Sequence, residues 1–392
     1  MRKFVRKVIK LVVLHVFDSD SDGVDDTEEV ADCDVCDEET IRRVFNLKCE
    51  AVTNQAIDKD KYILYLDGTL NSSPNVVVGL SGNTVEVYNF SNNRVAKLQT
   101  FEVSGDVTGV KSSRENNNIF YVGSKNCCID IIDLRSDNKI SFKDTTVAPE
   151  DEYKPLNCLD ISSNNLLLCG GTDLYAGDAY ILFWDIRKVK LLGAYWESHT
   201  DDITQVKFHP DDPNKLISGS TDGLINLYDL SQSSEDDAFI DCLNTESSIE
   251  ELSWFREDNK DMVACVTHTS DLQTWRLEDA QPYGYFHKEE IAKELKRKLE
   301  DYCYVASIQV NTDDKLVGLI GSNFGNGSCL RGFGVDKRSL LPLFDVKGNE
   351  QRVRCSWLQK NSNILIMGGE AGSIDVWSVE TNFGINNKRK KL

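Results

Sequence analysis

Residues 18–29, DSDSDGVDDTEE, place oxygen-bearing side chains at the spacing of a twelve-residue calcium-binding loop. Calcium prefers carboxylate and carbonyl oxygens, and such a loop wraps several of them around one ion. Gly23 stands at the sixth position, where the loop turns sharply. The candidate calcium ligands stand at positions one, three, five, nine and twelve: Asp18, Asp20, Asp22, Asp26 and Glu29.

The composition around this loop favours a different interpretation. Twelve of the 22 residues in 18–39 are acidic, so acids fall on ligand positions easily. Asp25 occupies the eighth position, where calcium loops usually carry an apolar residue. The residues that follow offer almost nothing for a flanking helix to pack, and no partner loop is present. We therefore predict that residues 1–40 form a disordered acidic extension, with no metal or other cofactor.

The charge of the whole chain limits its ligands. The 392 residues carry a net charge of −20, and no basic stripe is long enough to offset it. Such a body repels phosphate backbones, so nucleic acid is disfavoured as the main ligand. The N-terminus, MRKFVRKVIKLVVLHVF, is unlike a signal peptide because Arg6, Lys7 and Lys10 interrupt its apolar residues. No segment reaches the roughly 18 apolar residues of a membrane span, so no membrane contact is expected.

The cysteines and the C-terminus indicate where the protein works. The 12 cysteines lack the spacing of a disulfide framework, which is typical of reduced thiols inside cells. Cys33 and Cys36 lack the second ligand pair that a zinc site needs. The cluster KRKK, 388–391, is of the kind that nuclear import recognises. We expect a protein of the nucleus, the cytoplasm or both, and not a secreted one.

A three-strand unit recurs along the chain. In residues 199–230, an apolar strand, the turn HPDDPN, a second strand, the turn Asp222-Gly223 and a third, alternating strand follow one another. A gap of 102 residues near the C-terminus contains one further unit, at 305–333. The other third strands end at regular spacings: 85–89, 129–133, 181–185, 225–229, 272–276 and 374–378. Seven units are therefore expected.

These units resemble WD repeats, a family that folds as a β-propeller. The resemblance is carried by 192–230 and by ILFWDIR at 181–187, and it covers about residues 41–380. Gly332 and Phe333 depart from it, because they stand where the signature Trp-Asp pair belongs. The resemblance implies an all-β fold, a seven-bladed propeller. From the composition of the chain ends, we expect this propeller to lie between disordered termini.

The ends of such a ring have to meet, because an open ring leaves two unpaired strand edges. We nominate residues 41–52 as the strand that completes the last blade. The pattern of 287–302, with apolar residues four apart, predicts a helix between repeats five and six. Residues 381–392 are expected to form a basic tail.

The family resemblance also assigns a structural tetrad. In WD repeats, a His, a Ser, an Asp and an aromatic residue form a buried hydrogen-bond chain. Only the fourth repeat matches throughout: His199, Ser218, Asp222 and Tyr228. These residue types also occur in catalytic sites, but the repeat context favours a structural role.

Two features suggest partner contacts. Trp184-Asp185-Ile186-Arg187 resembles the box with which some propellers, the substrate receptors of cullin-4 ubiquitin ligases, bind the ligase adaptor. The alternative is the ordinary end of a repeat, since Trp-Asp ends most WD repeats. The insertion 173–177 carries Leu174 and Tyr175, which either form a contact patch or fold back on their own blade.

No catalytic motif accompanies this architecture. The chain contains no GxSxG, HExxH, phosphate-binding loop or dinucleotide fingerprint, and its five histidines are spread out. We therefore expect no enzyme, but a protein–protein interaction scaffold. The alternatives are a substrate receptor of a cullin-4 ligase that uses Arg187, and a propeller hydrolase with its site in the central channel.

Overall fold

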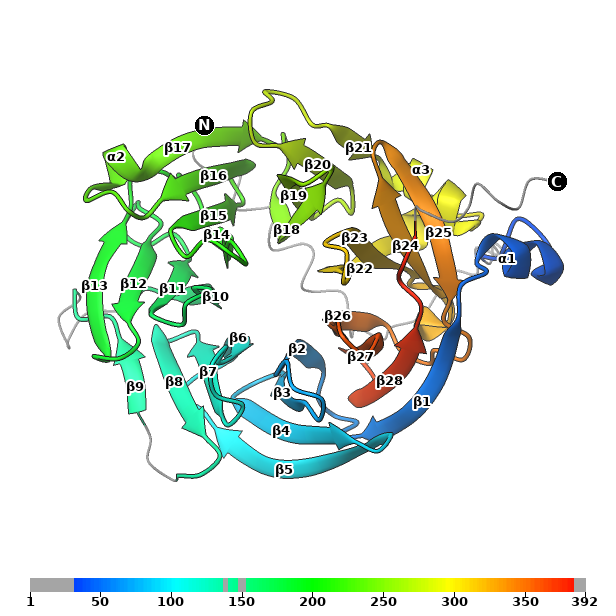
Figure 1. Cartoon of the computed structure of the whole chain (residues 1–392), viewed down its shortest axis with the longest axis horizontal. Helices are drawn as coiled ribbons and strands as arrows, with labels where there is room; N and C mark the ends of the chain where they lie inside the picture. Colours follow the sequence, from blue (N-terminus) through cyan, green and yellow to red (C-terminus); the bar gives the residue numbers. More distant parts are fainter. Residues whose placement is uncertain (1–31, 137–139, 147–152, 384–392) are drawn as a thin grey trace, which may run out of the picture. The chain divides into compact units, whose positions relative to one another are not determined.

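The computed structural model describes residues 32–136, 140–146 and 153–383. The calcium-loop candidates and the basic cluster 388–391 lie outside these residues. Within the described part, 28 strands form seven antiparallel sheets of four strands each. The sheets stand around a central axis as the blades of a propeller (Figure 1). The prediction of a seven-bladed, all-β propeller is confirmed.

Each blade runs from an innermost strand at the channel to an outermost strand at the rim (Figure 1). Blades 1 to 3 consist of β2 (Ile63–Gly68), β3 (Asn75–Leu80), β4 (Thr84–Ser91) and β5 (Arg94–Glu102); β6 (Val107–Ser112), β7 (Ile119–Ser124), β8 (Cys128–Asp133) and β9 (Ile140–Lys143); and β10 (Leu156–Ile161), β11 (Leu167–Thr172), β12 (Ile181–Asp185) and β13 (Lys190–Tyr195). Blades 4 and 5 consist of β14 (Ile203–Phe208), β15 (Lys215–Ser220), β16 (Leu224–Asp229) and β17 (Phe239–Asn244); and β18 (Ile249–Glu257), β19 (Lys260–Thr267), β20 (Leu272–Arg276) and β21 (Gly284–Phe286). Blades 6 and 7 consist of β22 (Cys303–Val310), β23 (Leu316–Ser322), β24 (Leu330–Asp336) and β25 (Ser339–Asp345); and β26 (Val353–Gln359), β27 (Ile364–Gly369), β28 (Ser373–Val379) and β1 (Cys49–Ala56).

The hydrophobic core lies between neighbouring blades. One cluster joins Cys169 and Ile181 of blade 3 to Ile203 and Val206 of blade 4. The blades approach so closely that a Cβ atom on Gly171 would lie 2.4 Å from the Ile203 side chain. A residue with a side chain would not fit there without moving one blade. Each blade is therefore held in place mainly by its neighbours.

The ring closes through β1, which pairs antiparallel with β28 from Cys49↔Val379 to Ala56↔Ser373. The nominated range 41–52 was wrong in part, because the strand covers 49–56 and the residues before it form helix α1 (Glu38–Val44). Asp37 caps this helix by accepting a hydrogen bond from the Thr40 backbone at 2.8 Å. Acids in its first turn and arginines in its last turn suit the helix dipole.

The predicted extension 1–40 was also too long, because residues 32–35 contact blade 6 and the segment that leads into it. The Val35 amide donates to the Lys296 carbonyl at 3.0 Å. Asp32 pairs with Arg297 at 2.8 Å, and Asp34 takes two hydrogen bonds from Arg331, each of 2.9 Å. Burial opposes ionisation of Asp34, but Arg331 holds the pKa of this carboxyl below its ordinary value.

The insertion between blades 5 and 6 contains helix α3 (Lys288–Leu295) and the short 3₁₀ helix η3 (Glu300–Tyr302). Ile291 and Leu295 of α3 are buried in a cluster with Phe286 and Ile320. The insertion therefore packs against the ring. Two further short helices, α2 (Glu235–Ala238) and η4 (Phe324–Gly327), lie in loops of blades 4 and 6.

The tetrad of the fourth repeat lies inside blade 4. His199 Nδ1 is 3.0 Å from Asp222 Oδ2, and His199 Nε2 is 2.7 Å from Ser218 Oγ. The Ser218 hydroxyl reaches the Tyr228 hydroxyl at 3.4 Å. Burial opposes ionisation of Asp222, but bonds from His199 and from the Thr200 amide lower its pKa. The four side chains fix the loop that leads into blade 4 to its second and third strands.

Replacing His199 by Ala should lower the free energy of unfolding by about 2–4 kcal/mol, because it leaves Ser218 and Asp222 buried without their partner. Chemical denaturation measures this change. His287→Ala is the matched control: His287 lies 3.9 Å from Asp271 with a side chain that is 55% exposed, so it should cost under about 1 kcal/mol. Equal losses in the two variants would contradict the structural role of His199.

Candidate functional site

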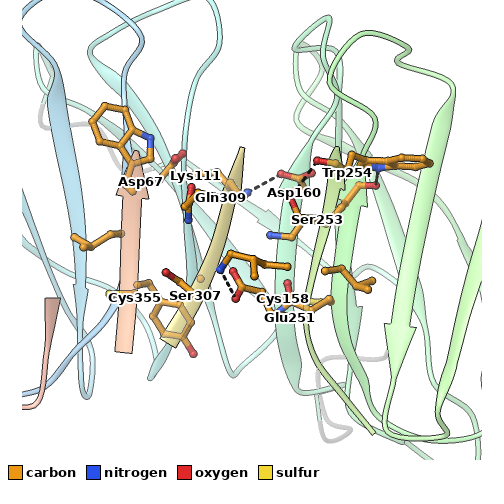
Figure 2. A pocket seen from close by; sticks show the side chains of 18 of the residues that line it. Asp67, Lys111, Cys158, Asp160, Glu251, Ser253, Trp254, Ser307, Gln309 and Cys355 are labelled. Atoms are coloured by element: carbon orange, nitrogen blue, oxygen red, sulfur yellow. Dashed lines mark hydrogen bonds and ion pairs between the residues drawn. The ribbon is translucent and has the colours of Figure 1, made fainter. Parts of the chain in front are cut away.

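A cavity of about 880 Å³ occupies the channel between the innermost strands. The seven inner strands share one pattern. In each of them, a bulge follows an aliphatic residue near the start of the strand. The side chains two and four residues after that aliphatic residue line the cavity. Figure 2 shows several of them pointing towards one another across the channel.

In blades 1 to 4, the side chains four residues after that aliphatic residue alternate in charge. They are Asp67, Lys111, Asp160 and Lys207. The Lys111 ammonium lies 2.9 Å from Asp160 Oδ1 (Figure 2). Burial opposes ionisation of Asp160, but Lys111 and Lys207 keep its pKa below the ordinary value. Burial, together with the charge of Lys111, lowers the pKa of Lys207.

The channel carboxylates are bonded to the backbone of the next blade. Asp67 Oδ2 accepts from the Ser112 amide at 2.7 Å, and Asp160 Oδ2 accepts from the Phe208 amide at 2.8 Å. Glu251 Oε2 accepts from the Ile308 amide at 3.1 Å. These groups therefore join neighbouring blades at the edge of the channel.

Glu251 differs from the other two carboxylates in its acidity. Burial raises the pKa of Glu251 to about 7, although the charge of Lys207 opposes the shift. A carboxyl with such a pKa can take or release a proton near neutral pH. It is the channel group best suited to acid–base chemistry.

The channel residues were not among the predicted site residues, because each is a single polar side chain within an otherwise apolar strand. A usable signal was present. In the inner strands of blades 1 to 4, counting four residues from the aliphatic residue that starts each strand selects Asp67, Lys111, Asp160 and Lys207.

The cavity opens at two mouths. We call one the intra-blade mouth, which lies beside the loops between first and second strands and carries Asp211, Arg256, Asp261, Asp314 and Lys360. The other, the inter-blade mouth, lies beside the loops that lead from one blade to the next and carries Asp173, Asp202 and Glu250.

The structure separates the members of the Trp184–Arg187 box. Trp184 is fully buried, and its indole donates to the Lys143 carbonyl at 3.0 Å. Asp185 accepts from the Lys188 and Arg187 amides, and these bonds lower its pKa. Both residues are therefore structural. Arg187 is exposed, and its guanidinium makes no ion pair with any residue that the structure describes.

The equivalent arginine of blade 2 is in a different state. Arg135 makes two hydrogen bonds to its own Asp133, at 2.9 and 2.7 Å. Its guanidinium is thus engaged within the repeat. Of the two boxes, only the one that ends at Arg187 has a guanidinium without an ion pair among the described residues.

The insertion in blade 3 is a small hairpin that is fixed at its base. Backbone bonds between Tyr175 and Asp178 close its tip, and the Leu174 amide donates to Asp202 Oδ1 at 2.7 Å. The buried Lys154 lies 4.5 Å from the Tyr180 ring and 6.0 Å from the Tyr175 ring. The Tyr175 ring is therefore partly covered, whereas Leu174 remains 44% exposed.

The described residues contain no group of three or more His, Cys, Asp or Glu side chains arranged to hold a metal ion. In the same part of the chain, no helix is long and apolar enough to cross a membrane.

Comparisons with known proteins agree with this architecture. The family model of the WD domain, G-beta repeat, matches residues 190–229. The chain is 27% identical to the WD repeat-containing protein 89 homolog of Dictyostelium discoideum, over 81% of this chain and 85% of that protein. It is 30% identical to an uncharacterized WD repeat-containing protein of Saccharomyces cerevisiae, over 77% of this chain and 75% of that protein.

Among solved structures, a chain of the "Crystal Structure of Mitotic Checkpoint Complex" matches with a TM-score of 0.63 and 20% identity, over 86% of this chain and 97% of that one. This match shows a shared fold. Together with the relatives, the seven blades and the tetrad of blade 4, it places the chain among known propellers. The chain belongs to the family of WD-repeat proteins.

Proposed function

We propose that this protein is a scaffold that holds other proteins on the surface of a rigid propeller. The proposal rests on the hydrogen bonds that the channel carboxylates accept from neighbouring blades. Three carboxylates each accept a hydrogen bond from the next blade and so join neighbouring blades: Asp67, Asp160 and Glu251. Exposed side chains that serve no such purpose, among them Arg187 and Leu174, stand on loops at the surface. Loops on a rigid scaffold are typical sites of partner binding.

A hydrolase is favoured by one feature alone, the pKa of about 7 of Glu251. Hydrolysis needs a second group near the same substrate atom, such as a nucleophile or a bound water. The Cys158 thiol, which lines the same cavity, is a poor nucleophile, because burial raises its pKa to about 12. We therefore consider a hydrolase function less well supported than a scaffold function.

A more specific form of the scaffold is a substrate receptor of a cullin-4 ubiquitin ligase. Arg187 supports it, because a free guanidinium makes bidentate contacts to carboxylates or carbonyls of a partner. Arg135 would not serve in the same way while it is bound to Asp133. The two arginines are therefore a matched pair for an experiment.

Affinity purification of the tagged full chain from cells should recover partner proteins in amounts comparable to the chain itself. Recovery of the chain alone would contradict the scaffold. In the receptor form, Arg187→Glu should remove the ligase adaptor from the recovered proteins, and Arg135→Glu should leave it in place. Absence of the adaptor from the wild-type sample, measured by quantitative mass spectrometry, would contradict the receptor form.

Glu251→Gln should stabilise the fold above pH 7. Because the pKa of Glu251 is about 7 in the fold and near 4.5 otherwise, the folded state binds its proton more tightly. The wild type therefore loses stability as the pH rises between these values, whereas the variant does not. The gain should reach up to about 3 kcal/mol in denaturant unfolding. Parallel pH profiles for the two proteins would contradict the assignment, and the exposed Glu278→Gln is the control.

A further inference from the structure

The outermost strands of four blades share one irregularity, a bulge that leaves an aliphatic residue without a partner on the neighbouring strand. In blade 6 this residue is Leu343. It is buried in a cluster against which Leu47 packs, and the Leu47 amide donates to the Leu343 carbonyl at 2.9 Å. In blades 1, 3 and 4 the bulge residues are Leu98, Leu192 and Ile240, which are 48%, 55% and 56% exposed. Blade 6 therefore shows that an apolar residue can cover such a bulge, and three other blades leave it uncovered.

The exposed bulges of blades 3 and 4 belong to one apolar patch. Strand β13 ends beside α2, where β17 begins (Figure 1). The Trp196 amide, just after β13, donates to Glu235 of α2 at 2.8 Å. The Tyr195 ring lies 5.5 Å from the Tyr228 ring, which lies 6.1 Å from the Phe239 ring at the start of β17. We call the four exposed apolar residues along these two strands the rim patch: Leu192, Trp196, Phe239 and Ile240.

The two ends of the rim patch carry opposite charges. Lys190 is exposed on β13, two residues before Leu192, and Asp241 is exposed on β17, directly after Ile240. Among residues 32–136, 140–146 and 153–383, neither Lys190 nor Asp241 makes an ion pair. Further exposed charges of the same signs precede the two strands: Arg187 and Lys188 on blade 3, Asp236 and Asp237 on blade 4. The patch therefore has a cationic end on blade 3 and an anionic end on blade 4.

We infer that the rim patch binds the rim patch of a second copy of this chain around a two-fold axis. A two-fold rotation lays the patch on itself in reverse, so the cationic end of each copy meets the anionic end of the other. Lys190 then faces Asp241 of the partner subunit, and the bulge residues meet between these charges. The net charge of −20 makes two copies repel each other in general, so a face that carries both signs is suited to self-association. This inference goes beyond the proposed scaffold function and does not depend on it.

Light scattering of the purified full chain during gel filtration measures the association over a dilution series. The concentrated wild type should have twice the mass of one chain. Ile240→Ser should weaken dimerisation by about thirtyfold, because it removes an exposed apolar side chain from each copy. Leu98→Ser, which removes the equivalent bulge residue of blade 1, should change it by less than about twofold. A wild type that is monomeric throughout the series, or equal effects of the two substitutions, would overturn the inference.

Reversed charges test the two-fold arrangement. Lys190→Glu should weaken dimerisation by about thirtyfold, because acids then face each other at both ends of the interface. Asp241→Lys should do the same, because cations then face each other. An equimolar mixture of the two variants should dimerise like the wild type, since one chain now carries acids at both ends of its patch and the other carries cations. Unchanged melting temperatures show that the variants are folded. Single variants that dimerise normally, or folded variants that stay monomeric when mixed, would contradict the two-fold contact.

Discussion

The antiparallel pairing of β1 with β28 is the interaction on which this structure depends. Its register, from Cys49↔Val379 to Ala56↔Ser373, joins the first part of the described chain to its last blade. An unpaired β28 would expose a strand edge. The segment before β1 strengthens the closure: Asp32 and Asp34 bind arginines next to and within blade 6, and the Leu47 amide donates to Leu343. Residues 32–56 therefore connect two blades.

Closure of the ring explains what the polar groups in the channel do. In a closed ring, every inner strand has a neighbour on each side, so a side chain can bond across the gap between blades. Asp67, Asp160 and Glu251 do so, each to a backbone amide of the next blade. A ring that is already joined at its inner edge is a rigid support. Its loops can then be used for binding without loss of the fold.

The part of the fold that could be predicted from the sequence is the part that is local. Turns such as Asp222-Gly223 and alternating strands such as 224–228 recur at a nearly constant period, and the number of blades follows from them. The tetrad was expected from the family resemblance. Its four side chains lie within hydrogen-bond distance in a single blade, because repeat spacing places them together.

Contacts between distant residues could not be predicted in this way. The acidic composition indicated a disordered segment up to residue 40. In the fold, Arg297 and Arg331 neutralise Asp32 and Asp34, and nothing near these acids in the sequence indicates that pairing. The closing strand was placed too early for a related reason: helix α1, with its cap at Asp37, takes the first residues of the nominated range and ends at Val44. The channel charges are single residues in different repeats, and only the common register of the blades brings them together.

Hydrogen exchange of the backbone amides in β1 tests the central claim most directly. If closure and folding are one equilibrium, the β1 amides that bond to β28 should exchange through global unfolding, with the same free energy as the amides of β15 in blade 4. This equality should persist as denaturant is added. Exchange of the β1 amides at a clearly lower free energy, while β15 remains protected, would show that the ring opens without unfolding and would contradict the account.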